Sequence, residues 1–230
     1  MKTIFFESKK KAPGNQVMPY EVNQAIIGIS FNKEDQHLVE YFDYFSSAVK
    51  ISSAFFVHVM PKIQLFDIYG NGDLPDALEG GTEINDDVVQ KMELQVTSWF
   101  TGHYKMYVEY EARTGDPLEE LITDTKELKA DLLVTGKTST RDWHGIITKN
   151  LIRRTVCNTL IIPEKAERRL THILVPLDFS PNSIRAFQTA LAIRKASPVP
   201  IKISCLHVYE IPNLNYYQIN KSAKQVEELV

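Results

Sequence analysis

The sequence predicts an α/β protein, in which an open five-stranded parallel sheet with helices on both faces is followed by a partial second copy. Two observations predict this class. Before Pro163, β-prone apolar runs alternate with apolar residues at helical spacing, which is typical of a parallel sheet covered by helices. After a charged linker the same pattern begins again. The 43% hydrophobic and 24% charged content is that of an ordinary globular protein.

The expected strands are short apolar or β-branched runs, found at residues 25–29, 54–59, 107–110, 130–134 and 159–162. Apolar residues at helical spacing lie between them, and we expect helices over residues 38–49, from an N-cap at Thr82 to residue 99, after Gly115-Asp116-Pro117, and over 146–152. Residues 61–81 are rich in glycine and proline. We expect a long loop there, and loops of that length are often functional.

An internal repeat with a period of roughly 150 residues divides the chain. Residues 173–180 match the position of residues 26–32, and the strand end Leu206-His207-Val208 matches Val57-His58-Val59. A lone βαβ unit is not expected to be stable. Either it packs on the first domain or a partner chain, or this chain is a fragment of a longer tandem protein, which we favour. The predicted organisation is an N-terminal extension (1–23), a first domain (24–163), a linker (164–171) and the opening of a second domain (172–230).

Four motifs together resemble the universal stress protein family: the run from Ile173 to Asn182, the Leu206-His207-Val208 strand end, Gly115-Asp116-Pro117 before a helix, and residues 130–136. The resemblance implies the strand order 3-2-1-4-5 and a role in stress survival. It also implies a homodimer or pseudo-dimer that pairs through the last strand, here Thr159, Leu160, Ile161 and Ile162.

Some members of that family bind ATP with a Gly-x2-Gly-x9-Gly-Ser/Thr loop after the fourth strand, where glycines and a helix N-terminus admit phosphate. Gly136 matches the first glycine, but Ser139 replaces the second. Gly145 arrives four residues early, before Ile146. Members that bind nucleotide also have an aspartate after the first strand, where this chain has Ser30.

We therefore expect the first domain to lack bound ATP and to use no cofactor. The segment Lys137, Thr138, Ser139 and Thr140 is expected to be a polar surface turn, with a weak anion site as the alternative. Asp178 does match the family's aspartate, but the glycine loop that would complete its site is not in this sequence.

Other classes of function find little support. The net charge of -3 and pI near 6.1 do not favour nucleic acid, and no apolar run reaches the ~20 residues that span a bilayer. We expect a cytoplasmic protein. His58 and His207 have no second ligand at metal spacing, so we expect structural roles and no metal. Cys157 and Cys205 lie beside apolar strand residues and are expected to be small buried hydrophobes.

The leading hypothesis is a noncatalytic stress-response protein that acts through dimerisation and an unknown protein partner. The alternative is an ATP-binding regulator or weak ATPase, with its nucleotide site in a completed second domain. A phosphoacceptor domain of the same layered class ranks below both. It would need aspartates at the strand ends where Ser30 and Gly136 stand.

Overall fold

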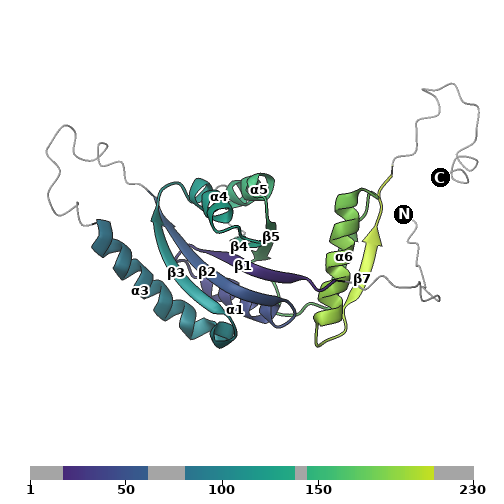
Figure 1. The fold of residues 1–230 in the computed structure, drawn as a ribbon, viewed down its shortest axis with the longest axis horizontal. Helices are drawn as coiled ribbons and strands as arrows, with labels where there is room; N and C mark the ends of the chain where they lie inside the picture. Colours follow the sequence, from purple (N-terminus) through teal and green to yellow (C-terminus); the bar gives the residue numbers. More distant parts are fainter. Residues whose placement is uncertain (1–17, 62–80, 138–143, 210–230) are drawn as a thin grey trace, which may run out of the picture.

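The computed structural model describes residues 18–61, 81–137 and 144–209 of the 230-residue chain (Figure 1). These ranges form a five-stranded sheet in the order β3-β2-β1-β4-β5 and a two-stranded sheet, β6-β7. All strand pairs in both sheets are parallel. The predicted fold class and strand order are confirmed.

The larger sheet consists of β1 (Glu21–Ile29), β2 (Lys50–Met60), β3 (Tyr107–Thr114), β4 (Leu132–Lys137) and β5 (Asn158–Pro163). β1 begins before the predicted residue 25 because long-range contacts extend it. The Asp131 carboxylate accepts hydrogen bonds from the N–H of Asn23 at 2.7 Å and of Gln24 at 3.2 Å. Residues 21–23, which the sequence placed in the N-terminal extension, are therefore strand residues.

β4 and β5 are the strands for which the sequence predicted a glycine loop and a dimer contact. β4 continues past the predicted residue 134, because Gly136 and Lys137 pair with Ile162 and Pro163 of β5. Strand β5 contains the four residues expected in the dimer contact, and in the described ranges it has a neighbouring strand on the β4 side only. Its outer edge is therefore open to a further strand.

Helices cover the two faces of this sheet, as Figure 1 shows. On one face lie α1 (Asp35–Ser46) and α3 (Gly81–Trp99), with the 3₁₀ helix η2 (Thr101–Lys105) after α3. On the other lie α4 (Pro117–Glu127) and α5 (His144–Arg154). Thr82 lies inside α3 instead of capping it, so that prediction is wrong. None of the described helices is both long and apolar enough to cross a membrane.

Each face of the sheet buries its own apolar core. The core under α1 and α3 is centred on three rings that are fully buried, Phe42, Phe56 and Phe100, with centroids 5.7–6.2 Å apart. The core under α4 and α5 contains Ile26, Val57, Leu121, Ile122, Leu133 and Leu151. Since β1 and β4 contribute to both cores, they are buried on both faces, as the continuous apolar runs predicted.

The second unit follows the linker and consists of β6 (His172–Pro176), α6 (Pro181–Ala196) and β7 (Lys202–Leu206). This strand-helix-strand order was predicted, whereas the possible second helix lies outside the described residues. The linker is attached to α1: Arg168 pairs with Glu40 at 3.0 Å, and the Tyr44 hydroxyl accepts the Leu170 N–H at 2.8 Å. Ile193 of α6 packs against the first core. The second unit is therefore in contact with the first domain.

Candidate functional site

A cavity of about 270 Å³ lies where β1, β2 and β4 end. The sheet reverses its strand order between β1 and β4, and ligands of open α/β sheets bind in the crevice at such a switch point. Its walls are largely apolar and include Gly28, Val57, Val59, Leu121, Leu151 and Ile162. The position and the apolar walls make this cavity the candidate functional site.

The loop after β1 forms one side of the cavity, and it is held by a buried carboxylate. Asp35, the first residue of α1, is only 4% exposed. Its carboxylate accepts hydrogen bonds from the N–H of Ser30 at 3.2 Å and of Asn32 at 3.0 Å. Burial raises the pKa of this carboxyl group, and the backbone hydrogen bonds partly oppose that rise. These N–H groups are therefore already occupied by the protein itself.

The described charges around the cavity are mainly negative. Glu34, Asp35 and Glu164 contribute carboxylates to its lining, and Lys137 is the one described lysine or arginine in that lining. Glu34 pairs with Lys33, outside the lining, at 3.6 Å. Such a balance favours neutral or cationic molecules over polyphosphates.

Two histidines line the same cavity. His58 Nδ1 donates to the carbonyl of Ile29 at 2.8 Å, so it joins the ends of β2 and β1. This is the structural role predicted for it. His37 Nε2 is buried and has no hydrogen-bond partner among the described residues, a feature that the sequence pattern did not reveal.

The glycine-loop residues are only partly described. Gly136 and Lys137 line the cavity from β4. A Cβ atom added at Gly136 would meet nothing within 4 Å, so close packing does not require glycine there. Gly145 is the second residue of α5 and does not precede the helix as predicted, since α5 begins at His144. Thr138, Ser139 and Thr140 lie outside the described residues.

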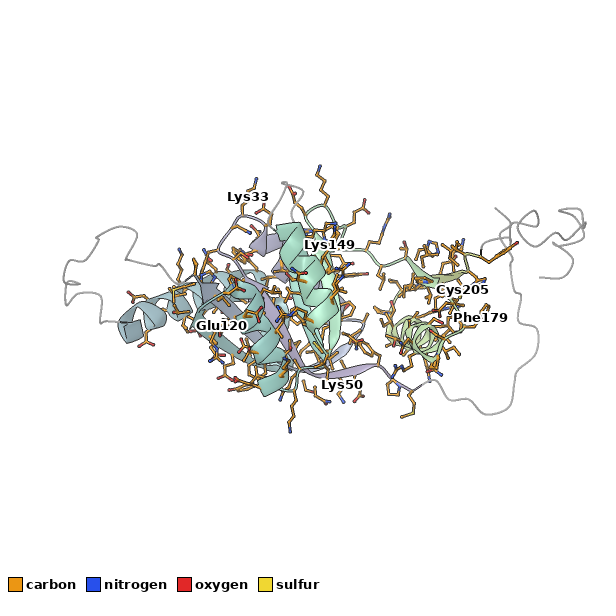
Figure 2. The ribbon with its side chains drawn as sticks, turned by 90° about the horizontal axis from the view of Figure 1, so that it is seen from above. Lys33, Lys50, Glu120, Lys149, Phe179 and Cys205 are labelled. Atoms are coloured by element: carbon orange, nitrogen blue, oxygen red, sulfur yellow. The ribbon has the colours of Figure 1, made fainter. Side chains whose placement is uncertain are left out.

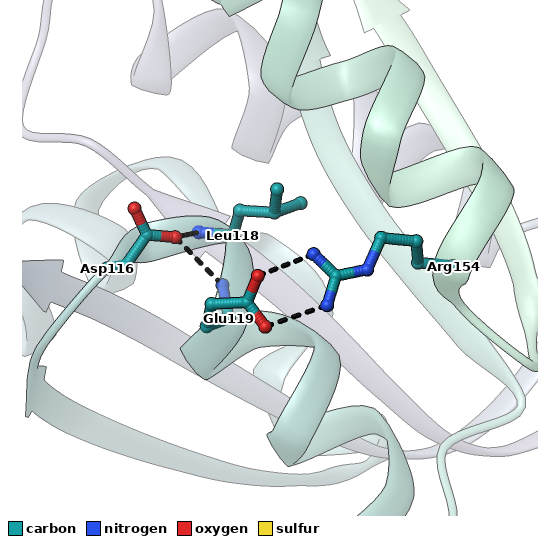
Figure 3. A network of polar contacts seen from close by, with 4 residues as sticks. All are labelled: Asp116, Leu118, Glu119 and Arg154. Carbon is teal, nitrogen blue, oxygen red and sulfur yellow. Dashed lines mark hydrogen bonds and ion pairs between the residues drawn. The ribbon is translucent and has the colours of Figure 1, made fainter.

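A polar network connects α4 to α5, and Figure 3 shows its members. Asp116 caps α4 by accepting the N–H of Leu118 and of Glu119, each at 3.0 Å. Glu119 forms a two-bond ion pair with Arg154 at the end of α5, one bond being 2.8 Å. This hydrogen bonding lowers the pKa of Glu119. The cap was predicted from Gly115-Asp116-Pro117, but the pairing of α4 with α5 was not.

A second polar group joins β3 to α4, and one of its members, Asp124, is buried. Asp124 is 1% exposed and pairs with Arg113 at 3.1 Å, while Arg113 also pairs with Glu111 at 3.0 Å. Desolvation raises the pKa of Asp124 to about 6 against the lowering effect of Arg113, and the charges of Glu111, Glu127 and Glu120 add to the rise. The second carboxylate oxygen of Asp124 has no partner among the described atoms. This pair was not predicted from the sequence, because Asp124 and Arg113 come together only through the fold.

Asp178 lies in a different place from Gly136 and Lys137. It lines an open cavity of about 390 Å³ in the second unit, with Ser180 and Leu206 among its neighbours. Its exposed carboxylate accepts the Ser180 N–H at 2.9 Å, and hydrogen bonding to Ser180 lowers the pKa of Asp178 to about 2. Ser180 also caps α6, with Pro181 in its first turn, as predicted. Of the predicted site residues, Gly136 and Lys137 therefore line one cavity and Asp178 lines the other.

The remaining predictions concern histidine and cysteine. His207 Nδ1 donates to the Leu177 carbonyl at 2.6 Å, a structural role as expected. Cys157 is half-buried, and burial raises the pKa of its thiol. Cys205 is exposed on β7 (Figure 2); the expectation that it is buried is wrong, because no described element covers that part of the strand. In the described ranges no three His, Cys, Asp or Glu side chains could hold a metal ion.

Several solved structures are similar to this protein in fold. A universal stress protein from Archaeoglobus fulgidus DSM 4304 superposes with a TM-score of 0.61 and 14% identity, over 90% of this chain and 70% of that chain. UspA from Lactobacillus plantarum matches 63% of this chain and 99% of its own, with a TM-score of 0.42 and 14% identity. A universal stress protein in complex with cAMP matches 63% of this chain and 98% of its own, with a TM-score of 0.44 and 16% identity.

No family model and no curated protein matches the sequence. The similarity to the Archaeoglobus structure therefore carries the comparison, and at 14% identity it establishes the fold alone. It confirms, at the level of the fold, the resemblance that the four sequence motifs indicated. This chain has the fold of the universal stress proteins.

Proposed function

We propose that this chain is a cytoplasmic, noncatalytic stress-response or regulatory protein that acts through dimerisation and partner binding. In this proposal its first domain does not bind ATP. One fold can host many functions, so the fold alone does not support this proposal. The part that concerns ATP depends on the cavity at the ends of β1 and β4.

One observation supports the proposal that the first domain does not bind ATP: the Asp35 carboxylate already accepts backbone N–H groups of the loop after β1. Phosphate sites in α/β folds use unpaired backbone N–H groups and positive charge. Here the N–H groups of Ser30 and Asn32 already bind Asp35. Glu34 and Glu164 add negative charge to the same lining. A triphosphate would therefore meet unfavourable charge on this side of the cavity.

Thermal unfolding with and without millimolar Mg-ATP, Mg-ADP or AMP tests this part of the proposal. A ligand that binds the native state at about 100 times its Kd adds roughly 2.7 kcal/mol to the free energy of unfolding, which is several degrees for a chain of this size. We expect no rise in the midpoint. A rise that persists in the Asp178→Asn variant would place ATP in the first domain and overturn the proposal.

The alternative, an ATP-binding regulator with its site in the second unit, is favoured by one observation. The Asp178 carboxylate is exposed and lines a cavity of about 390 Å³, whereas Asp35 is buried. If this alternative holds, Mg-ATP raises the unfolding midpoint of the wild type, and Asp178→Asn removes the rise.

The proposed dimer contact is the outer edge of β5. The N–H groups of Asn158 and Glu164 bind Asp131 and Lys137 on the β4 side, at 3.1 and 3.0 Å. Because successive N–H groups of a strand alternate in direction, those of Thr159 and Ile161 point to the open edge. Two apolar residues in the segment that leads into β5 are exposed, Ile152 of α5 at 50% and Val156 at 78%. An isologous pairing of two β5 strands would satisfy the edge and cover these residues.

A further inference from the structure

The loops after β1 and β6 share an unusual backbone feature, a phenylalanine with positive φ. Phe31 and Phe179 are two of the three non-glycine residues with positive φ in the described ranges, at 55° and 64°. A side chain in this conformation is unusual and needs support from its surroundings. The strand that follows each loop is paired in the same register, since Ala25 lies opposite Ala54 and Ile173 opposite Ile203.

The histidines that follow these loops repeat the match. His58 bonds the Ile29 carbonyl at 2.8 Å, and its ring lies 4.5 Å from that of Phe31. In the second unit His207 bonds the carbonyl of Leu177 at 2.6 Å, and its ring lies 4.9 Å from that of Phe179. The two units therefore share one loop structure, and residues can be compared position by position.

One backbone N–H group in this loop binds a carboxylate from a different position in each unit. The residue after each phenylalanine, Asn32 or Ser180, donates its N–H to a carboxylate, at 3.0 and 2.9 Å. In the second unit the acceptor is Asp178, at the strand end. In the first unit the strand-end residue is Ser30, and the acceptor is Asp35, which reaches back from the first turn of α1.

We propose that Asp35 is a positioning residue that replaces the strand-end carboxylate of the first unit. Residues 30 and 35 are then alternative positions for one carboxylate that holds the loop at the edge of the cavity. The choice of position decides what a ligand meets: Asp178 is exposed, whereas Asp35 is 4% exposed and directed at the backbone. This inference does not depend on whether either unit binds ATP.

The surroundings of residues 30 and 35 allow the carboxylate to be moved from position 35 to position 30. Ser30 is exposed, so an aspartate there requires no space in the core. The buried Asp35 carboxylate accepts the N–H of Ser30 at 3.2 Å and of Asn32 at 3.0 Å, so it satisfies two nearby backbone donors. Two carboxylates at once would compete for the Asn32 N–H and repel each other.

A double-mutant cycle tests the proposal. Asp35→Ala leaves two donors unsatisfied and is expected to lower the unfolding midpoint by on the order of 5 °C. Ser30→Asp in the wild type is expected to give no gain. In the Asp35→Ala background, Ser30→Asp is expected to recover at least half of the loss. Strict additivity of the two changes would overturn the proposal.

A matched control uses the other end of α1. Asp43 accepts the N–H of Gly102 at 2.9 Å and of Thr101 at 3.3 Å, so Asp43→Ala also removes a carboxylate from two backbone donors. Ser30→Asp must not rescue that variant, and rescue of both would indicate a general effect of charge.

A local readout distinguishes loop positioning from stability alone. Amide hydrogen exchange at Asn32 is expected to speed up in Asp35→Ala and to slow again in the double variant. If Asp35→Ala does not fold, Asp35→Asn, which keeps one acceptor oxygen, is used in the same cycle. An Asn32 amide that exchanges equally fast with and without Ser30→Asp would contradict the proposal.

Discussion

Aspartates that accept backbone N–H groups hold the ends of several elements in this protein. Asp131 binds the start of β1, Asp35 the loop after it, and Asp116 the start of α4. Each carboxylate satisfies donors that would otherwise need water. Of these three, the sequence predicted the role of Asp116 alone, because a cap next to proline is a local signal. Asp35 and Asp131 were missed: Asp131 acts across more than a hundred residues, and Asp35 depends on the shape of a loop.

The buried Asp124 predicts a pH dependence of stability. Its pKa is about 6 in the folded protein, above the ordinary value of 3.8, so the folded state binds this proton more tightly than the unfolded state. The favourable contribution is present below pH 3.8 and is lost as the pH rises through about 6.

Urea unfolding of the wild type and of Asp124→Asn at pH 4.5 and pH 7.5 measures this effect. The wild type is expected to lose about 1–3 kcal/mol relative to the variant as the pH rises. If the wild type keeps its stability relative to the variant, or gains relative to it, as the pH rises, Arg113 keeps Asp124 charged throughout this range.

At the scale of elements, the order of strands and helices could be predicted from the sequence, but several ends could not. Alternating apolar runs and helical spacing identify each element because both reflect burial. The true ends depend on neighbours. β4 reaches Lys137 because β5 pairs with it that far. Likewise, the resemblance placed a candidate site after the first and fourth strands, whereas the negative lining comes from Glu34 and Glu164, which no motif joins.

The cap of α4 gives a prediction at this scale. Asp116→Ala removes the acceptor of two N–H groups and is expected to cost about 1 kcal/mol, which lowers the unfolding midpoint by roughly 2–4 °C. Asp116→Asn keeps a side-chain oxygen and is expected to lose less. Differential scanning calorimetry of the two variants provides the comparison, and an equal loss in both would mean that charge matters more than the hydrogen bonds.

At the scale of the whole molecule, the two units differ in how well they are covered. Ile26 of β1 is fully buried beneath α4 and α5, whereas Leu174, at the equivalent position in β6, is 58% exposed. Val59 is 8% exposed and its counterpart Val208 is 77% exposed. The first domain thus has a complete pair of cores, and the described second unit has cover from α6 on one face. In the described ranges the second unit therefore exposes apolar strand residues whose counterparts in the first domain are buried.

The central claim, that the protein acts as a β5-paired dimer without nucleotide, is tested most directly by sedimentation velocity. Ile161→Pro removes an N–H at the open edge of β5 and leaves the bonds to β4 intact. Ala112→Pro is the matched control. Since the Gly115 N–H binds Met60 in β2, the alternation places the Ala112 N–H at the outer edge of β3.

We expect the wild type and Ala112→Pro to sediment as dimers, unchanged by Mg-ATP, and Ile161→Pro to sediment as a monomer. A wild type that is monomeric, or that dimerises only with Mg-ATP, would contradict the account.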